Sequence, residues 1–417
     1  MQRRTTLRQD AEAILIQAIG ENLPGPAVER ALKDFTAPAG KLILIAIGKA
    51  AWTMAKTASE VLGDLIGSGL VITKYHHVKA PIRGIECLEA GHPVLDENSL
   101  AATRRAEELV SGLTADDCVL FLVSGGGSAL FEDPKVDLTT LADINRQLLA
   151  SGASIQEMNC VRKHLSNVKG GRFAQTCAPA HVLAIALSDV LGDALDTIAS
   201  GPTYPDATSS QDALSICDTY QIRLTDEARS ALSEETPKSL DNAEIQVIGS
   251  VRQLTHAAAK AAAKLGYEPH ILTCGATGEA REVGALLGQI AAEHATDASD
   301  TCYLIGGETV VHITGDGFGG RNQELALAAA EPIAGIENVC VASIGSDGTD
   351  GPTDAAGAVV DGQTCTILES KNIKAADYIA ASDSYHAHEA AGTLIVTGPT
   401  GTNVNDVAIA LIRAHKG

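Results

Sequence analysis

Short apolar runs rich in β-branched residues alternate along this chain with stretches of helical periodicity. The runs of strand length lie at residues 42–47, 119–123, 182–187, 245–248, 303–305, 339–344 and 394–396. The helical patterns lie at residues 50–62, 100–111, 138–151, 251–265, 279–294 and 322–330. Strands that are apolar throughout and are followed by amphipathic helices predict mostly parallel sheets covered on both faces. We therefore expect a doubly wound α/β fold.

The length of the chain, 417 residues, exceeds what one hydrophobic core usually organises, so we expect two domains. A polar stretch with a proline, residues 233–243, precedes a new strand–helix unit that starts at Ile245. It predicts a boundary, and we place the first domain at residues 1–236 and the second at 237–417.

Charge and cysteine content exclude several classes of protein. A net charge of -21 argues against a surface for nucleic acid or anionic membrane, because both need clustered positive charge. The nine cysteines are dispersed and form no C-x-x-C pair, so a disulfide framework or a structural zinc site is not expected. The first ten residues contain no apolar segment of a secretory signal, and no apolar run approaches membrane-spanning length. These features predict a cytoplasmic protein.

The turns after the predicted strands are the places to search, because open parallel sheets bind ligands at the carboxyl ends of their strands. Gly48 and Lys49 follow the run at 42–47 and open a helix, where backbone N–H groups already favour an anion. The alternative is a solvated lysine in the first turn. The pattern is not a phosphate-binding loop of the G-x-x-x-x-G-K-[ST] type.

A second turn is richer in glycine. Ser124, Gly125, Gly126, Gly127 and Ser128 follow the run at 119–123. Consecutive glycines let neighbouring N–H groups form an anion-binding nest, and the serines add donors. The alternative is a flexible turn. Neither the dinucleotide pattern G-x-G-x-x-G nor the hydrolase pattern G-x-S-x-G is present here.

Basic residues cluster further on, although the chain as a whole is acidic. Arg162, Lys163, Lys169 and Arg172 lie close together, and Asp189 follows the next predicted strand. Each basic residue alone could belong to a solvated helix face. Together they predict part of a phosphate or carboxylate site, and a carboxylate at a strand end suits a metal or a hydroxyl proton.

The second half of the chain repeats this arrangement. Glu308 and Asp347 each follow a predicted strand, and Arg321 and Asn322 open a predicted helix. His386 and His388 are two residues apart on a possible helix and cannot face one metal together, so we interpret them as structural.

Several of these turns together resemble one family. The matching motifs are Gly48-Lys-Ala-Ala51, Gly91-His-Pro93, Ser124-Gly-Gly-Gly-Ser-Ala-Leu130, Lys169-Gly-Gly-Arg172, Ser188-Asp-Val-Leu-Gly-Asp193, Ser200-Gly-Pro-Thr203, Gly306-Gly-Glu-Thr309, Gly320-Arg-Asn-Gln-Glu324, Gly348-Thr-Asp-Gly-Pro-Thr-Asp354 and Gly398-Pro-Thr-Gly-Thr-Asn403. In this order they resemble the class II glycerate 2-kinases, whose second half is a MOFRL domain. The resemblance implies a Rossmann-like N-terminal domain, a smaller α/β MOFRL domain and an active site in the interdomain cleft. It also implies ATP-dependent phosphorylation of D-glycerate at its 2-hydroxyl, with Mg²⁺ or another divalent cation.

Under this hypothesis the candidate residues take particular roles. Lys49 and Arg321, one from each domain, supply positive charge to the migrating phosphoryl group. Asp189 orients or deprotonates the 2-hydroxyl or binds Mg²⁺, and Glu308 and Asp347 reach the metal. The groups predicted to hold substrate or phosphate are the nest from Ser124 to Ser128 (Gly125, Gly126 and Gly127 included), Lys169 and Asn322.

Two alternatives remain. One is an NAD(P)H-dependent hydroxypyruvate reductase, for which His92 and His164 are the histidines near candidate loops. The other is a non-catalytic sensor of sugar phosphates or hydroxy acids. For all three readings we expect a small-molecule ligand, no nucleic acid or membrane partner, and a homodimer.

Overall fold

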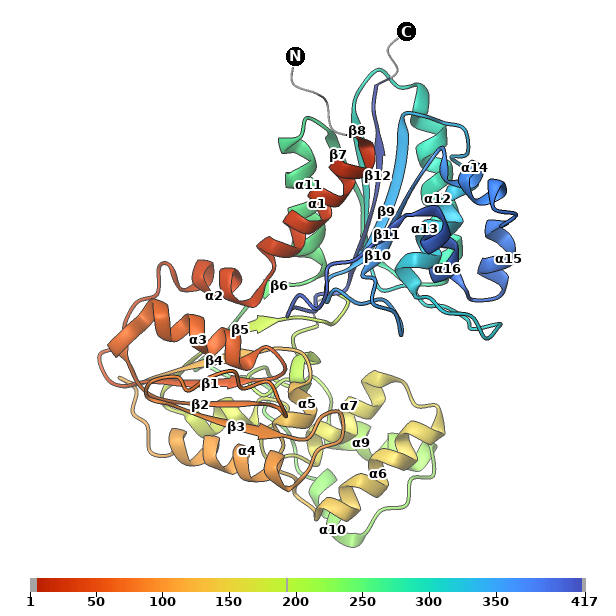
Figure 1. The fold of residues 1–417 in the computed structure, drawn as a ribbon. Helices are drawn as coiled ribbons and strands as arrows, with labels where there is room; N and C mark the ends of the chain where they lie inside the picture. The colour runs from red at the N-terminus through yellow and green to blue at the C-terminus, as the bar shows by residue number, and fades with distance from the viewer. Residues whose placement is uncertain (1–5, 193, 415–417) are drawn as a thin grey trace. The chain divides into compact units, whose positions relative to one another are not determined.

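The computed structural model describes residues 6–192 and 194–414, and within them the chain forms two compact units (Figure 1). The central unit comprises Ala27–Ile248, and the terminal unit combines Met1–Pro26 with Gly249–Gly417. The predicted division at 236/237 differs in two respects: the boundary lies at 248/249, and the N-terminal helix belongs with the second half of the chain.

The central unit holds a sheet with strand order β3-β2-β1-β4-β5-β6. Its strands are β1 (Leu42–Ile47), β2 (Ile66–Lys74), β3 (Ile85–Ala90), β4 (Cys118–Val123), β5 (His181–Leu187) and β6 (Ala243–Gly249). Pairing is parallel from β3 across to β5. Its helices are α2 (Pro24–Leu32), α3 (Ala51–Leu62), α4 (Glu97–Val110), α5 (Gly127–Leu130), α6 (Leu138–Ser151), α7 (Ile155–His164), α8 (Arg172–Cys177), α9 (Ser210–Thr219) and α10 (Asp226–Leu232).

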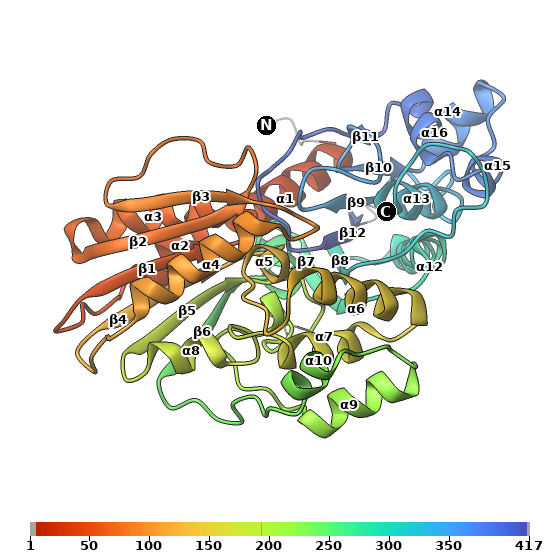
Figure 2. The same cartoon turned by 90° about the horizontal axis from the view of Figure 1, so that it is seen from below.

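Both faces of this sheet are buried. Along β1, Ile43, Ile45 and Ile47 pack toward α4 and α8, whereas Leu42 and Leu44 pack toward α2 and α3. Successive side chains of a strand point to opposite faces, so a strand covered on both faces must be apolar throughout. The predicted doubly wound α/β architecture is thereby confirmed for this unit. Helices α6, α7, α9 and α10 form a separate cluster beyond the carboxyl edge of the strands (Figure 2).

The terminal unit holds a second sheet, with order β11-β10-β9-β12-β8-β7. Its strands are β7 (Glu268–Ala276), β8 (Thr301–Gly307), β9 (Val339–Gly345), β10 (Gly357–Asp361), β11 (Leu394–Ile395) and β12 (Asp406–Ile412). Its helices are α1 (Leu7–Glu21), α11 (Val251–Lys264), α12 (Ala280–Glu293), α13 (Arg321–Ala330), α14 (Thr364–Ser370), α15 (Ala375–Ala380) and α16 (Ser384–Ala391).

The expectation of mostly parallel pairing is wrong for this second sheet. Strands β7 and β8 are parallel, but β12 lies antiparallel between β8 and β9, and β10 is antiparallel to β9. A strand buried on both faces is apolar whichever way it runs, so the hydrophobic pattern does not encode strand direction.

Helix α1 completes the core of the terminal unit. For this reason α1 belongs to that unit and not to the central unit that follows it in the sequence. Ile14, Leu15 and Ala18 are fully buried in the cluster that also contains residues of α11, β9 and β12. Polar bonds reinforce this packing, since Asp10 accepts hydrogen bonds from the Tyr267 hydroxyl and from Arg413, both at 2.7 Å.

Among the residues described, no helix combines the length and apolar character that crossing a membrane requires. All nine cysteines are free thiols, which agrees with the expected absence of a disulfide framework.

Candidate active site

A pocket of about 810 Å³ opens at the carboxyl edge of the sheet in the central unit. The loops after β3, β4 and β5 line it together with α6. Its lining is polar beside the β4 loop, and α6 contributes mostly apolar side chains together with Asn145 and Arg146. The polar part includes His92, Ser124, Gly125, Gly126, Gly127, Ser128, Glu132, Arg162, Lys169 and Asp189. This position agrees with the rule that parallel sheets bind ligands beyond the carboxyl ends of their strands.

The loop after β4 is bonded to the loop after β1. The Ser124 hydroxyl accepts a hydrogen bond from the Ala50 N–H at 3.0 Å and donates to the Ile47 carbonyl at 3.1 Å. The Lys49 N–H donates to the Gly125 carbonyl at 2.9 Å. The Ser124 hydroxyl therefore holds two loops together, which corrects the expectation that it is a free donor for a ligand.

Two backbone donors of this loop remain available. The N–H groups of Gly125 and Gly126 donate to no other residue within the described parts of the chain. Gly126 is in the left-handed region, with φ of 86°. Adjacent N–H groups in a turn of this kind form an anion-binding concavity. The predicted nest is present in geometry, with backbone donors and without the Ser124 side chain.

Lys49 and His92 lie against Gly126. A Cβ at Gly126 would lie 2.9 Å from two atoms of the His92 ring and 3.3 Å from Lys49 Cε, so only glycine fits there. Burial, followed by the positive charge of Lys49, lowers the pKa of His92. His92 is therefore neutral at pH 7, and the exposed Lys49 is the cation at this end of the loop.

Asp189 approaches the same loop from the end of β5. A Cβ added to Gly125 would lie 2.5 Å from Asp189 Oδ2, so the carboxylate sits directly beside the nest. The fold thus brings together three predicted elements that are far apart in sequence, namely Lys49, the loop at 124–128 and Asp189. Asp193, at the end of the same motif, lies outside the described residues.

The next segment of the pocket wall has a strained backbone. Ala199 and Ser200 have φ of 51° and 62°, values that residues with a Cβ rarely adopt. Such conformations cost about 1–3 kcal/mol each and persist where surrounding bonds hold them. Here Ser200 Oγ lies 3.0 Å from Ser128 Oγ, and the Ser200 carbonyl accepts from the Gly170 N–H at 3.1 Å. The strain lies at the pocket, where it presets the position of the Ser128 hydroxyl.

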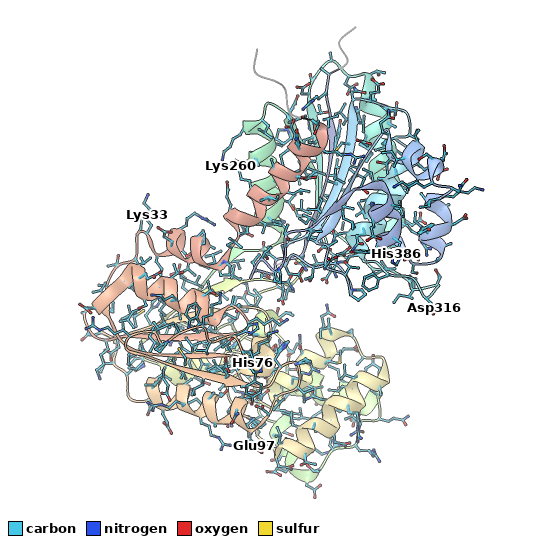
Figure 3. The ribbon with its side chains drawn as sticks, viewed as in Figure 1. Lys33, His76, Glu97, Lys260, Asp316 and His386 are labelled. Carbon is cyan, nitrogen blue, oxygen red and sulfur yellow. The ribbon has the colours of Figure 1, made fainter. Side chains whose placement is uncertain are left out.

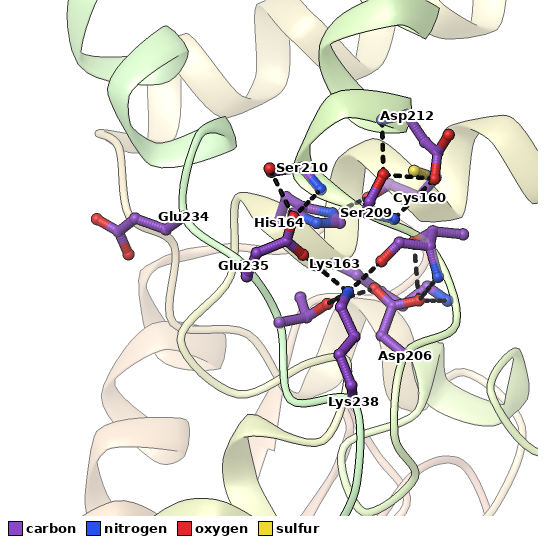
Figure 4. A network of polar contacts seen from close by, with 12 residues as sticks. Cys160, Lys163, His164, Asp206, Ser209, Ser210, Asp212, Glu234, Glu235 and Lys238 are labelled. Carbon is purple, nitrogen blue, oxygen red and sulfur yellow. Dashed lines mark hydrogen bonds and ion pairs between the residues drawn. The ribbon is translucent and has the colours of Figure 1, made fainter.

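The basic residues predicted to form one cluster have different roles in the structure. Lys163 is buried and pairs with Asp206 at 2.8 Å (Figure 4). It also pairs with Asp196 at 3.2 Å. Lys169, predicted to bind substrate or phosphate, is also buried and forms an ion pair with Glu132. Arg162 lines the pocket and donates from Nε to Asn145 Oδ1 at 2.8 Å. The charge of Lys169 is therefore already balanced within the protein, by a partner that was not predicted from the sequence.

Replacing Lys169 with methionine is expected to destabilise the protein by about 3–5 kcal/mol, because it leaves the buried Glu132 carboxylate without its cation. Urea unfolding followed by circular dichroism measures the change. The control is Lys56→Met, which removes a lysine from an exposed pair with Glu60 and should shift stability by less than about 1 kcal/mol. Equal midpoints for the two variants would show that the buried pair contributes nothing.

In the terminal unit, the predicted residue Arg321 lies at the start of α13 between two acids. Its Nε and Nη2 donate to the two carboxylate oxygens of Asp406 at 2.5 and 3.0 Å, and Nη1 lies 3.3 Å from Glu308 Oε1. Hydrogen bonding and the charge of Asp406 outweigh burial and raise the pKa of Arg321, so the guanidinium is permanently charged. Asp406 is not among the residues predicted for the site, because it opens a strand, β12, that was not predicted.

Asn322 and Asp347 have their main bonds inside the protein. Asn322 is buried, donates to Asp350 Oδ1 at 3.3 Å and accepts from the Ser343 hydroxyl at 2.6 Å. Both ends of the Asn322 amide thus have a partner within the protein, and its contact with a ligand stays a prediction. Asp347 accepts from the Thr349 N–H and hydroxyl, at 3.0 and 3.1 Å, in the turn after β9.

The residues predicted to bind metal are divided between the two units. Within residues 6–192 and 194–414, no group of three or more His, Cys, Asp or Glu side chains has the geometry of a metal site. Asp189 belongs to the central unit, whereas Glu308 and Asp347 belong to the terminal unit.

The two histidines of α16 differ in environment. His386 is exposed and pairs with Asp383 at 2.6 Å, near the loop that carries Asp316 (Figure 3). His388 is fully buried, with Nε2 2.8 Å from the Gln323 carbonyl and Nδ1 2.7 Å from the Thr393 hydroxyl. Both ring nitrogens of His388 thus have partners in the protein, as expected of a structural residue.

Burial lowers the pKa of His388 from about 6.5 to about 4. Between these pH values the unfolded chain binds a proton at this site and the folded chain does not. Stability is therefore fully present above pH 6.5 and falls by about 3 kcal/mol as the pH drops to 4. Urea unfolding at several pH values should show this slope, which His388→Gln removes and His386→Gln retains. An unchanged slope in His388→Gln would contradict the assignment.

Comparison with known proteins yields matches along almost the whole chain. Residues 10–233 match a domain of unknown function, DUF4147, and residues 301–406 match the MOFRL family. The D-glycerate 2-kinase of Thermotoga maritima is 48% identical over 98% of this chain and 99% of its own length. A protein named putative hydroxypyruvate reductase from Agrobacterium vitis is 40% identical over 97% of this chain and 94% of its own. The crystal structure of glycerate kinase from T. maritima superposes with a TM-score of 0.93, covering 97% of this chain and 99% of that one.

Proposed function

This chain belongs to the class II glycerate kinase family, in which a DUF4147 domain precedes a MOFRL domain, and we propose that it phosphorylates D-glycerate at the 2-hydroxyl with ATP. The observation that carries the proposal is the meeting of Lys49, the N–H groups of Gly125 and Gly126, and Asp189 at one end of a pocket. Phosphoryl transfer requires positioning and positive charge more than covalent chemistry, and this arrangement supplies both.

The reaction begins with the 2-hydroxyl of glycerate. Asp189 is placed to accept the hydroxyl proton as the oxygen attacks the γ-phosphorus. The new O–P bond forms while the bond from this phosphorus to the oxygen of ADP breaks. Lys49 and the N–H groups of Gly125 and Gly126 stabilise negative charge on the phosphoryl oxygens, because donors aimed at developing charge act strongly where water is excluded.

The residues present fit a nucleotide phosphate, since the nest offers two N–H donors with no partner among the described residues and Lys49 lies beside it. We propose that Mg²⁺ binds mainly to the phosphates of ATP, which is its usual mode in kinases and needs only one or two carboxylates from the protein. When bound, it neutralises charge on the β- and γ-phosphates. Asp189, Glu308 and Asp347 remain the predicted carboxylates, and Arg321 remains the predicted second cation.

The free thiols of all nine cysteines support the proposed cytoplasmic location, because reducing compartments preserve thiols. The homodimer stays a prediction.

One set of assays tests the activity. The purified protein is incubated with D-glycerate, ATP and Mg²⁺, and ADP release is followed. Enolase is then added without phosphoglycerate mutase, so that only 2-phosphoglycerate is converted to phosphoenolpyruvate. We expect ADP release that depends on glycerate and a product that enolase consumes directly.

Three other outcomes distinguish the alternatives. A product that enolase accepts only after mutase is added would place the phosphate on the 3-hydroxyl. NADH oxidation with hydroxypyruvate, without ADP release, would support the reductase. Ligand binding without either reaction would support the sensor.

A further inference from the structure

Three ionisable side chains meet in the wall of the pocket, and the proposed mechanism uses none of them. Glu132 and Lys169 are 4% and 1% exposed and form an ion pair with each other. Arg162 lines the same pocket and is close enough to interact electrostatically with both. Two cations and one carboxylate leave a net charge of +1 at this place, in a protein whose net charge is -21.

The hydrogen-bonding capacity of this cluster is not saturated. Within the described parts of the chain, Glu132 Oε1 is buried and has no hydrogen-bond partner. Arg162 uses Nε on Asn145, and its Nη1 and Nη2 groups donate to no described residue. Buried polar groups in native proteins are nearly always paired, so an unused acceptor beside unused donors points to a ligand.

The donors and the acceptor define the chemistry of that ligand. The two Nη groups of an arginine lie in one plane and match the two oxygens of a carboxylate. Glu132 Oε1 can accept a hydrogen bond from a hydroxyl. A phosphate dianion fits less well, because the net charge of the cluster is only +1 and the Glu132 carboxylate would repel it.

We propose that Arg162 binds the carboxylate of the substrate and that Glu132 accepts a hydrogen bond from one of its hydroxyls, with Lys169 holding Glu132 in place. This inference rests on the proposed function and assigns one of its open contacts. The nest of Gly125 and Gly126 is then left for the phosphate. Arg162 and Glu132 are specificity-determining residues, because a pocket of about 810 Å³ is far too large to select a three-carbon acid by shape.

Titration calorimetry with D-glycerate and the whole chain, without nucleotide, tests the role of Arg162, together with the KM values for glycerate and ATP. In Arg162→Gln we expect glycerate binding to weaken by about 30-fold or more, as when one partner of a buried charged pair is removed. Arg162→Lys should weaken binding to an intermediate extent, since it keeps the charge but loses the paired donors. The KM for ATP should change by less than about twofold.

The matched control is Arg146→Gln. Arg146 lines the same pocket, but its guanidinium pairs with Asp143 on α6. Thermal unfolding confirms that each variant is folded. Wild-type affinity for glycerate in a folded Arg162→Gln variant would overturn the proposal. So would an equal loss in Arg146→Gln, which would indicate only a general effect of positive charge.

Ligand analogues test Glu132 without disturbing its pair with Lys169. Glycerol lacks the carboxylate, D-lactate lacks the 3-hydroxyl and 3-hydroxypropionate lacks the 2-hydroxyl. Wild-type protein should bind D-glycerate more tightly than all three, and Arg162→Gln should no longer distinguish glycerate from glycerol. If both hydroxy analogues bind the wild type as tightly as glycerate does, the role of Glu132 is wrong.

These results separate the site from the proposed activity. Glycerate binding that depends on Arg162 but is not accompanied by ADP release would support the site and refute the kinase. Glycerate-dependent ADP release that Arg162→Gln does not change would support the kinase and refute the site. A wild-type protein that shows neither binding nor a saturable KM for glycerate would refute both.

Discussion

Replacing Lys49 with alanine is expected to lower kcat for glycerate phosphorylation by about 10²–10⁴-fold, the range found when a key transition-state charge is removed. The physical reason lies in the loop geometry. Lys49 Cε lies beside Gly126. The N–H groups of Gly125 and Gly126 have no acceptor among the described residues, so the lysine and two backbone donors are available at the same loop. Negative charge that develops on the phosphoryl oxygens would lose the cation that lies against Gly126.

Steady-state kinetics of ADP release measure the effect. The matched control is Lys56→Ala on the following helix, where the lysine is exposed and pairs with Glu60. It removes the same charge from the same segment and should change kcat by less than about twofold, because exposed pairs contribute little. A Lys49→Ala variant with near-wild-type kcat would eliminate Lys49 from the mechanism, whatever the result for the rest of the pocket.

Arg321→Ala is expected to lower kcat by a similar factor of about 10²–10⁴, if Arg321 is the second cation that stabilises the transferring group. The arginine is held by two bonds to Asp406 and by Glu308, which keeps the guanidinium in one orientation. Burial raises the pKa of Asp406 to about 6 even with Arg321 beside it. Without the arginine, this carboxyl should bind a proton near neutral pH rather than remain a buried charge.

Two further variants separate catalysis from folding. Arg321→Lys keeps a cation beside Asp406 and should fold normally, while kcat falls because the paired donors are lost. Arg281→Ala removes an arginine that pairs with Glu279 near the protein surface of the same unit, and it should leave kcat unchanged. Loss of thermal stability in Arg321→Ala with kcat preserved would show that the cluster with Asp406 is structural only.

Some strands could be predicted from the sequence and others could not. Strands β1, β4, β5 and β9 lie in the middle of their sheets, and their uniformly apolar runs predicted them with small errors at the ends. Strands β3 and β7 lie at sheet edges and mix exposed with buried positions. Their hydrophobic patterns are correspondingly weak, and they were not predicted. Position in the sheet does not explain every case, because β12 is central and fully buried but was missed, whereas the edge strand β6 was predicted.

The packing partner of α1 could not be predicted from the sequence. The apolar face of α1 is visible in the sequence, but nothing in it states that Ile14 and Leu15 pack in a core built from residues beyond 249. An apolar helix face can pack against any apolar surface, so it does not specify its partner. Polar contacts make this partner specific, among them the bonds of Asp10 with Tyr267 and Arg413 and the ion pair of Arg8 with Asp361.

For the site, the sequence by itself determined the features that depend on neighbours along the chain. These are the glycine nest after β4, the position of Lys49 at a helix start and the placement of Asp189 after β5, because strand, turn and helix are local structures. Only the tertiary structure decided which charges stay available to a ligand. Lys163 pairs with Asp206, Lys169 with Glu132 and Arg321 with Asp406, at separations of 43, 37 and 85 residues. Coulomb energy depends on distance in space, so a charge that looks free in the sequence is assigned its partner by the fold.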